Sequence, residues 1–292
     1  FSPDADAPAK EVSGAQTTAP YEDLDAARKF AQSVDVVTFE FENVPDNVLA
    51  VISDLSPVRP SADALHVSQD RQTKKAFINR LGIATAPWAP VLEQNDLSTA
   101  AAQTGFPAIL KTARLGYDGK GQVRVEAKSD LMAAWTSIGK MPSVLEGFVD
   151  FEREISVIVA RSVESKTESY VPVDNVHKDH ILYSTTAPSS VSEEIGEKAK
   201  QIAEKIVTAL NLVGLLAVEM FVMRDGSVLV NEIAPRPHNS GHWTIEGAAT
   251  SQFENHIRAI LGLPLGDTRR VAPRVVMDNV IGPDAASAHT QV

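Results

Sequence analysis

The chain has 292 residues, of which 43% are hydrophobic and 22% charged, values typical of a soluble globular protein of two or three domains. A net charge of −11 argues against generic binding to nucleic acid or to an anionic membrane, and no apolar run is long enough to span a bilayer. The absence of cysteine excludes disulfides, thiolate nucleophiles and cysteine-ligated metal clusters. A cytoplasmic location is the default expectation.

The first part of the chain, residues 1–88, predicts an α/β domain. Helices are expected over 21–32, 45–55 and 61–82, the last in one or two pieces with Gly82 as its stop. A buried strand is expected at 34–41. Because helices and strands alternate here, the pattern predicts a parallel sheet.

The pattern changes after Trp88 and predicts two further units and a tail. Residues 89–150 read as a small sheet-plus-helix unit, with strands at 107–111, 122–126 and 143–148 and a helix at 129–139. Residues 151–282 read as a larger mixed-sheet unit, with strands at 153–161 and 168–173, a helix at 192–210, a hairpin at 215–234 and a helix at 251–261. Residues 283–292 read as a tail.

Two glutamates are expected to face each other in the hairpin. If Asp225-Gly226 forms a two-residue turn, Glu219 lies opposite Glu232. The neighbours predicted on the same face are apolar: Ala217, Phe221, Val228, Val230 and Ala234. Two carboxylates on such a face repel each other and lose hydration unless a cation or a proton relieves them. Oxygen ligands alone suit Mg²⁺, which usually brings substrate phosphates with it. The alternative is a solvated sheet edge with two incidental acids.

A glycine-rich loop separates two strands of the small unit. Gly116, Gly119 and Gly121 allow backbone N–H groups to approach a phosphate, and Lys111 and Lys120 can neutralise its charge. The loop is neither a Walker A motif nor a Rossmann turn, because Ser or Thr does not follow Gly-Lys and a strand rather than a helix follows the loop. An ordinary turn is the alternative.

A polar segment, residues 234–244, follows the second strand of the hairpin. Such a segment is costly to order unless it binds something. Arg236 can counter a phosphate or bicarbonate anion, and His238 and His242 can donate to an oxyanion or shuttle a proton. Alternatively, His242 and Trp243 cap the core.

Three further polar side chains carry weaker signals. Glu146 ends a strand where a hinge to adenine could lie, and Glu154 lies on the next strand, but each alone is more often a surface carboxylate. His177 is expected in a loop, where a lone histidine usually has no special role.

Taken together, the glycine-rich loop, the glutamate pair and the run Asn231-Glu232-Ile-Ala-Pro-Arg-Pro-His-Asn-Ser-Gly-His-Trp resemble the ATP-grasp superfamily. Within it the chain most resembles the 5-(carboxyamino)imidazole ribonucleotide synthases of purine biosynthesis, over about residues 35–282. The run that begins at Glu232, with Ser251-Gln-Phe-Glu254 after it, is its most specific part. The resemblance implies an α/β (α+β) ATP-grasp fold in which 89–150 is the lid subdomain and 151–282 the main subdomain with the metal site.

The resemblance also implies a ligase that uses ATP and Mg²⁺, takes bicarbonate and 5-aminoimidazole ribonucleotide as substrates, and forms a homodimer. ATP would phosphorylate bicarbonate to carboxyphosphate, and the substrate amine would capture the carboxyl group under a lid that excludes water. Two alternatives stay open: an ATP-grasp ligase with another acceptor, such as biotin or a glycinamide nucleotide, or a non-catalytic ATP-binding remnant.

The roles implied for individual residues fall into two groups. On the nucleotide side, phosphate contacts are expected from Arg71, Lys111 and Lys120, and a flexible lid is expected from Gly116, Tyr117, Asp118, Gly119, Lys120, Gly121 and Gln122. An adenine pocket is expected from Glu146, Gly147, Phe148 and Val149, with further nucleotide contacts from Glu154 (ribose) and His177. A Mg²⁺ site is expected from Glu219 and Glu232, with Asn231 beside them. On the substrate side, catalytic contacts are expected from Glu40 or Glu42, Tyr117, Lys120, Arg236 and His238.

The chain departs from the resembled family at both ends. Family members open with a strand and a glycine-rich turn that are not found before Phe1, and they close with a small basic domain that is not found after 283–292. We therefore expect an incomplete N-terminal domain and a missing C-terminal domain, in which case ATP binding can persist where turnover fails.

Overall fold

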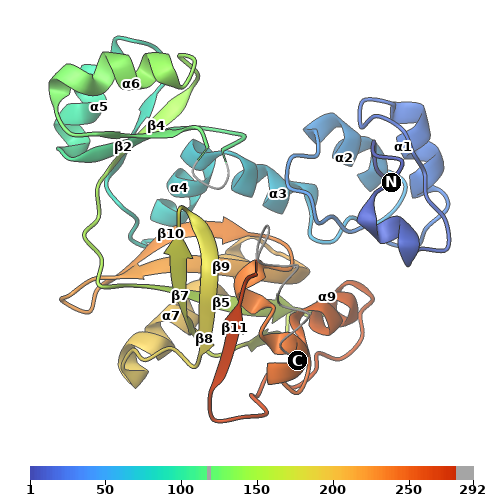
Figure 1. The fold of residues 1–292 in the computed structure, drawn as a ribbon. Coiled ribbons are helices and arrows are strands. Elements are labelled where there is room, and N and C mark those ends of the chain that lie inside the picture. Colours follow the sequence, from blue (N-terminus) through green and yellow to red (C-terminus); the bar gives the residue numbers. More distant parts are fainter. Residues whose placement is uncertain (117–119, 281–292) are drawn as a thin grey trace.

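The computed structural model describes residues 1–116 and 120–280. The predicted lid residues Tyr117, Asp118 and Gly119 and the predicted tail, residues 283–292, lie outside the described residues. Figure 1 shows three units: an N-terminal group of helices, a small sheet with helices above it, and a large sheet below. Within the described ranges, no helix is both long enough and apolar enough to cross a membrane.

The N-terminal unit is built from helices rather than a sheet. Its helices are η1 (Pro8–Glu11), α1 (Leu24–Ala31) and α2 (Asp46–Ser53), and the two longer ones pack on a core that includes Val37 and Phe39. The prediction of a strand at 34–41 is wrong. Within the described residues, this segment forms one isolated parallel bridge, between Val37 and Val58. The bridge consists of two hydrogen bonds, from the N–H of Val37 to the carbonyl of Pro57 and from the N–H of Arg59 to the carbonyl of Val37, which is too few for a parallel sheet.

Two helices then lead from this unit to the large sheet. α3 (Ala62–Gln69) and α4 (Arg71–Arg80) are the two pieces of the predicted helix. They part at Asp70, whose extended backbone ends α3 and whose side chain accepts the N–H of Thr73 to cap α4. The predicted stop is confirmed, since Gly82 has a φ of 70°.

The small unit is a four-stranded antiparallel sheet covered by helices (Figure 1). Its strand order is β1 (Trp88–Val91), β4 (Ser143–Gly147), β2 (Ala108–Thr112) and β3 (Gln122–Val125). Its helices are α5 (Asp96–Thr104), η2 (Lys128–Asp130) and α6 (Leu131–Ser137). Inward side chains such as Leu110, Leu145 and Trp135 form a separate core, so this unit carries its own packing.

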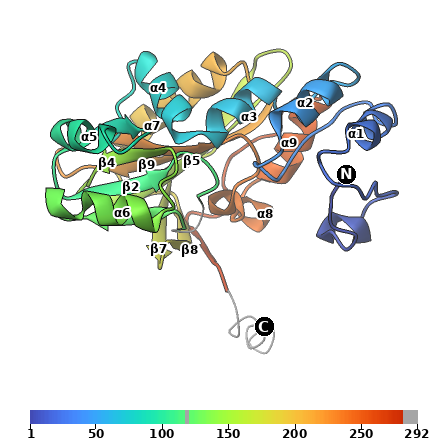
Figure 2. The same cartoon turned by 90° about the horizontal axis from the view of Figure 1, so that it is seen from above.

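The large unit is a seven-stranded antiparallel sheet with helices on both faces (Figures 1 and 2). The main strand order is β10 (Val228–Ala234), β9 (Gly214–Val222), β5 (Arg153–Arg161), β7 (Val173–Lys178), β8 (Ile181–Ala187) and β11 (Val275–Asp278), with β6 (Thr167–Ser169) beside β5. α7 (Glu193–Ala209) packs on one face against residues such as Val157 and Val218. The other face meets Trp243, next to η3 (Asn239–Gly241), α8 (Thr244–Gly247) and α9 (Gln252–Ile260).

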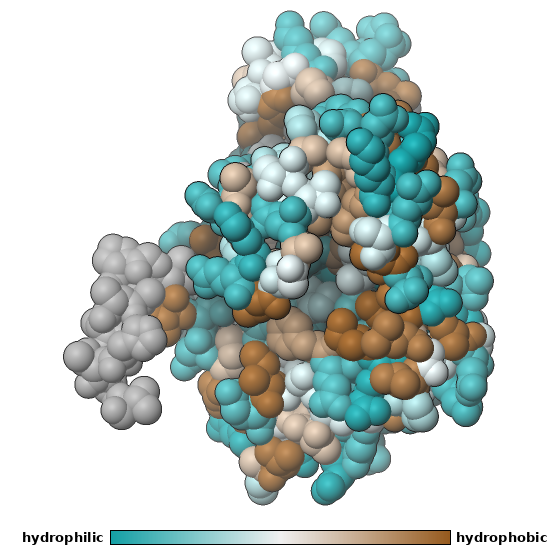
Figure 3. Space-filling model, turned by 90° about the vertical axis from the view of Figure 1, so that its right-hand side faces the viewer, coloured by the Kyte–Doolittle hydropathy of each residue, from teal (hydrophilic) through white to brown (hydrophobic). Residues whose placement is uncertain are grey.

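α9 also exposes apolar groups to solvent. Phe253 and Ile257 of α9, and Leu261 directly after it, are between 39% and 54% exposed. Figure 3 views the molecule from the side of α9, and apolar side chains gather in the lower half of that view.

Two strand predictions in this unit need correction. The strand expected at 168–173 is divided into β6 and β7, because Pro172 lies between them and cannot donate to a ladder. β8 was not predicted. It follows a two-residue turn at Asp179 and His180, which take φ values of 50° and 66° without the glycine that usually marks such a turn.

The hairpin pairs the two glutamates by a different route from the predicted one. Its turn has three residues, 224–226, closed by the N–H of Met223 on the carbonyl of Ser227, with Gly226 at a φ of 79°. The ladder next to this turn is one residue out of the predicted register, and a β-bulge at Asn231 shifts it back so that Glu232 opposes Glu219.

The bulge decides which side chains share the face of Glu219. Before it, Leu229 pairs with Phe221 and Val230 pairs with Met220. Val228 and Val230 therefore lie on the opposite face, in the core beneath α7, and their predicted place beside the glutamates is wrong. The bulge also allows the consecutive residues Asn231 and Glu232 to face the same cavity.

Candidate active site

One cavity of about 370 Å³ lies between α4, the small sheet and the large sheet. Eleven of the predicted site residues line it: Arg71, Lys111, Gly116, Lys120, Gln122, Glu146, Glu154, His177, Glu219, Asn231 and Glu232. Six residues that were not predicted as site residues also line it: Lys74, Lys75, Ile109, Phe151, His180 and Phe221. We call this the nucleotide cavity, after the role that the sequence resemblance implies for its residues.

Basic groups dominate one wall of the nucleotide cavity. Arg71 donates from Nη1 to the carbonyl of Thr112 (2.7 Å) and from Nη2 to that of Gly116 (3.1 Å), which ties α4 to the start of the glycine-rich loop. Lys74 and Lys75 follow on the same helix, and Lys111 comes from β2. Such a cluster suits a polyanion such as a triphosphate.

Glu146 is a buried ion-pair partner and not a surface carboxylate. It is 5% exposed and accepts from Lys111 (3.0 Å) and Lys75 (3.2 Å). Burial alone would raise the pKa of Glu146, but the two ammonium groups outweigh burial and the pKa lies below its usual value. The remaining predicted adenine residues, Gly147, Phe148 and Val149, do not line the cavity, and Phe148 is 41% exposed under the guanidinium of Arg124.

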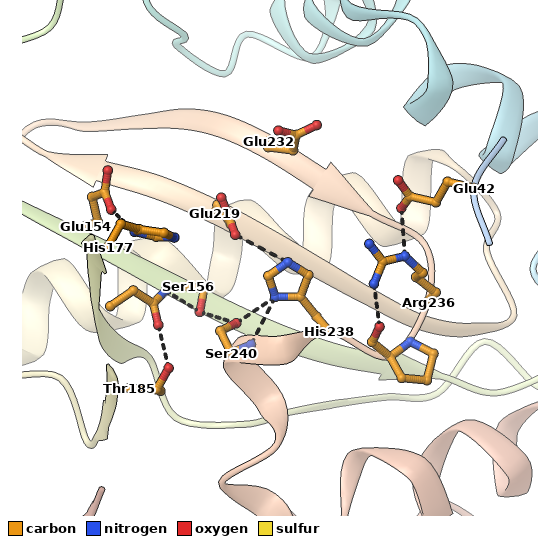
Figure 4. Close-up of polar contacts among 12 residues, drawn as sticks. Glu42, Glu154, Ser156, His177, Thr185, Glu219, Glu232, Arg236, His238 and Ser240 are labelled. Atoms are coloured by element: carbon orange, nitrogen blue, oxygen red, sulfur yellow. Dashed lines mark hydrogen bonds and ion pairs between the residues drawn. The ribbon is translucent and has the colours of Figure 1, made fainter. Parts of the chain in front are cut away.

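The glutamate pair lies on the hairpin at the edge of this cavity (Figure 4). The side chain of Glu232 is 45% exposed and bonds Nζ of Lys74 at 2.5 Å, whereas that of Glu219 is 21% exposed. Burial and the charge of Glu232 raise the pKa of Glu219 to about 7. Burial opposes ionisation of Glu232 as well, but Lys74 and Arg71 lower its pKa to about 2.

These residues fit a magnesium ion. A divalent cation would favour the ionised form of Glu219, which burial and Glu232 now oppose. In the part of the chain that the structure describes, no group of three or more His, Asp or Glu side chains could hold a metal without help. Two carboxylates with Asn231 beside them match Mg²⁺, which is commonly held by one or two carboxylates and completed by phosphates and water.

Glu154 and His177 form a second polar pair in the cavity. His177 lies on β7, not in a loop, and its Nδ1 contacts a carboxylate oxygen of Glu154 on β5. This contact raises the pKa of His177. Nearby, the rings of Phe151 and Phe221 stack at 4.5 Å with an interplanar angle of 6°. The pair and the rings supply a polar and an aromatic wall that could hold a nucleoside.

The segment after β10 connects the nucleotide cavity to the N-terminal unit (Figure 4). His238 lies 3.3 Å from Glu219 through Nε2, and Arg236 lies 3.3 Å from Glu42 through Nε. Burial, and after it the charge of Arg236, lower the pKa of His238 to about 3. The ring of His238 is therefore a neutral imidazole.

A second cavity of about 710 Å³ lies next to Arg236. Arg236 lines it together with Glu40 and His242, so the two glutamates of the N-terminal unit have different surroundings. The core-capping alternative holds for Trp243, which is 2% exposed and meets the ring of Tyr170 edge-on at 6.1 Å. It does not hold for His242, which lines the cavity.

The sequence missed Lys74 and Lys75, although a signal was present. Both lie three or four residues before Ile78, whose side chain is buried against the large sheet, so they occupy the inward side of α4. Lysines in such positions usually have a buried anionic partner. The partners, Glu232 and Glu146, are distant in sequence and could not be named.

A small antiparallel sheet and a large one that enclose a cationic cavity with an acid pair at its edge define an ATP-grasp enzyme. In agreement, an ATP-grasp domain model matches residues 76–253, and a ribonucleotide synthetase preATP-grasp domain model matches residues 1–69. The chain belongs to the N5-carboxyaminoimidazole ribonucleotide synthase family of ATP-grasp ligases, as the sequence resemblance indicated.

Relatives match the chain over most of its length. The N5-carboxyaminoimidazole ribonucleotide synthase of Brucella melitensis is 48% identical over 97% of this chain and 78% of the relative, and that of Bacillus subtilis is 41% identical over 96% and 73%. An ADP complex of an N5-carboxyaminoimidazole ribonucleotide synthetase superposes with a TM-score of 0.95 at 39% identity, covering 99% of this chain and 77% of the other. The Aspergillus clavatus enzyme in complex with ADP and 5-aminoimidazole ribonucleotide gives 0.89 at 33% identity, covering 98% and 76%.

Proposed function

We propose that this chain uses ATP and bicarbonate to carboxylate the amine of 5-aminoimidazole ribonucleotide. The observation that carries the proposal is the junction at Glu219: this carboxylate borders the nucleotide cavity and also contacts His238 of the segment that leads to the N-terminal unit. Phosphoryl transfer and carboxyl transfer would therefore take place next to each other. The relatives named above support the same reaction.

Phosphorylation of bicarbonate is assigned to the nucleotide cavity. The basic side chains of Arg71, Lys111 and Lys120 would bind the phosphates of ATP, and Glu154 and His177 would bind the nucleoside. Mg²⁺, held by Glu219 and Glu232, would offset the negative charge that develops on the transferred phosphoryl group. In this assignment Lys75 and Glu146 keep the floor of the cavity in place.

Carboxyl transfer is assigned to the side of Arg236 and His238. The guanidinium of Arg236 would bind the carboxyphosphate anion, and Nε2–H of His238 would donate to an oxygen of it. Glu42 already orients Arg236, so we propose Glu42 rather than Glu40 for this side. Because carboxyphosphate is short-lived in water, residues 116–122 would close over it, with Tyr117 and Lys120 toward the acceptor.

The domain division stays part of the proposal. Residues 1–88 would carry the acceptor side, 89–150 the lid, and 151–282 the metal site. A homodimer and a cytoplasmic location, both expected from the sequence, are proposed as well; the exposed apolar side chains of α9 support a contact surface.

A coupled assay of ADP release tests the function. With ATP, Mg²⁺ and bicarbonate, we expect ADP release to rise when 5-aminoimidazole ribonucleotide is added, and a carboxylated product to form in equal amount. Biotin and glycinamide ribonucleotide should give no such rise. Release stimulated by one of these two acceptors would contradict the proposed substrate, and ATP binding without ADP release under any condition would contradict the proposed activity.

A further inference from the structure

A chain of buried polar side chains crosses the large sheet and ends on His238 (Figure 4). Thr185 of β8 donates to Oδ1 of Asn175 on β7 (3.0 Å), and Nδ2 of Asn175 donates to Oγ of Ser156 on β5 (2.9 Å). Ser156 donates to Oγ of Ser240 (2.8 Å), which lies 2.9 Å from Nδ1 of His238. All four side chains before His238 are buried, and none of them lines the nucleotide cavity.

Hydrogen-bond chemistry allows this chain to run in two directions. In one, each hydroxyl donates toward His238, so Nδ1 accepts and the ring proton is on Nε2. In the other, the amide of Asn175 is turned over, each hydroxyl donates away from His238, and Nδ1 must carry the proton. The heavy-atom distances alone do not separate the two directions.

Two groups beside His238 identify the first direction as the one present: the N–H of Ser240, which only donates, and the ionised carboxylate of Glu219, which only accepts. The backbone N–H of Ser240 also points at Nδ1 of His238, at 3.3 Å, and an N–H can only donate. On the other side of the ring, a carboxylate oxygen of Glu219 lies 3.3 Å from Nε2 and needs a donor there. A proton on Nδ1 would face the N–H of Ser240 and leave two lone pairs facing each other at Glu219.

We propose that this hydrogen-bond chain fixes His238 in the Nε2–H tautomer and thereby aims its proton at Glu219. Thr185, Asn175, Ser156 and Ser240 are positioning residues: they act on the reaction through His238. The effect on the reaction rests on the proposed function: the Nε2–H of His238 orients Glu219 and can donate to the oxyanion of carboxyphosphate. The tautomer itself does not depend on which acceptor the enzyme uses.

The backbone at His238 explains why the side chain needs such a device. The side-chain amide of Gln252 accepts the N–H of His238 (3.0 Å) and donates to its carbonyl (2.7 Å), so the backbone is clamped. What the clamp does not set is the orientation and the tautomer of the ring. The polar chain sets both, and a buried polar chain of this kind is costly unless every member is satisfied.

The tautomer is measured by ¹⁵N NMR of the full chain labelled at histidine. The chain has seven histidines, and the spectrum of His238→Gln identifies the resonances of His238. At pH 8 we expect a pyrrole-type Nε2 and a pyridine-type Nδ1. The opposite pattern, an equal mixture of the two, or a doubly protonated ring would overturn the proposal without any further variant.

Asn175→Asp tests the direction with almost no change of shape. An ionised carboxylate at this position only accepts, so Ser156 is expected to donate to it and the chain to reverse, which moves Nδ1 of His238 toward the pyrrole-type shift. Turnover should fall by about 10- to 100-fold, as for partners that orient a ligand of a metal site, with KM for ATP unchanged. An unchanged His238 spectrum in a folded variant would overturn the role of Asn175.

Asn255→Asp is the matched control, because it places the same change at another buried amide, one that bonds Tyr170 and Gly266 instead. It should leave the His238 spectrum unchanged; a reversal there too would overturn the role of the chain. If Asn175→Asp does not fold, Thr185→Val releases Oδ1 of Asn175 and is expected to give a mixture of tautomers. A wild-type enzyme with the Nε2–H pattern but no turnover of 5-aminoimidazole ribonucleotide contradicts the proposed function and leaves the tautomer assignment standing.

Discussion

Three charged side chains form the floor of the nucleotide cavity. Glu146 is buried between Lys75 and Lys111, so two cations and one anion are withdrawn from water together. Desolvation lowers the pKa of Lys75, whereas Glu146 raises it. Such a group contributes little to stability as a whole, but removing one partner leaves the others buried without compensation.

Glu146→Gln is therefore expected to destabilise the protein strongly. Two ammonium groups would remain without their carboxylate, which costs about 3–5 kcal/mol of the free energy of unfolding. Urea denaturation followed by circular dichroism measures the loss. The matched control is Glu164→Gln, which breaks an exposed pair with Lys166 (2.9 Å) and should leave the midpoint unchanged. Equal midpoints for Glu146→Gln and the wild type would show that Glu146 is not a structural ion-pair partner.

Several single residues were predictable through the family resemblance rather than from their own sequence neighbours. Arg71, Lys111, Glu154 and His177 were placed by resemblance, and the structure brings them to one cavity. The hydroxyl and amide groups that reach His238 were not predictable, because Ser156 and Thr185 lie on different strands and are connected only through the strand order of the sheet. A local pattern carries no information on such contacts.

At the scale of elements, α9 is held against the N-terminal unit by two polar contacts. Nε2 of His256 lies 2.8 Å from the hydroxyl of Thr38, and Arg59 donates to the carbonyl of Ile260 at 2.5 Å. His256 is 4% exposed, and burial lowers its pKa to about 4. In the unfolded chain its pKa is near the ordinary value of about 6.5.

This contact is expected to weaken in acid. Between pH 6.5 and pH 4 the unfolded chain binds a proton at His256 that the folded chain does not, so the stabilisation is fully present above pH 6.5 and is lost as the pH falls toward 4. The loss amounts to about 3 kcal/mol. Unfolding free energies of the wild type and His256→Gln, measured across this window, should diverge by that amount. Parallel curves would contradict the assignment.

The hairpin shows how an element can be predicted correctly for an incomplete reason. The pairing of Glu219 with Glu232 is confirmed, but it comes from a three-residue turn followed by a bulge at Asn231. Neither deviation has a distinct sequence signal: Asp225-Gly226 suits both turn lengths, and a bulge depends on the packing of both strands. The two deviations cancel at the glutamates and not at Val228 and Val230.

At the scale of the whole molecule, the prediction of an ATP-grasp fold is confirmed and that of an N-terminal parallel sheet is wrong in the described residues. The ATP-grasp units are antiparallel, and a hairpin such as β9–β10 carries strand and turn signals in its own sequence. A parallel sheet needs pairing between distant segments. The segment at 34–41 has the composition of a strand and finds one bridge, to Val58.

The central claim is that Glu219 and Glu232 act together on a divalent ion at the nucleotide cavity. The most direct measurement is ADP release by Glu232→Gln with ATP, Mg²⁺, bicarbonate and 5-aminoimidazole ribonucleotide, next to Glu168→Gln, which neutralises an exposed glutamate on β6 of the same sheet. We expect at least about a 100-fold loss for Glu232→Gln with an unchanged circular dichroism spectrum, and wild-type rates for Glu168→Gln. ADP release by a folded Glu232→Gln at the wild-type rate would contradict the claim.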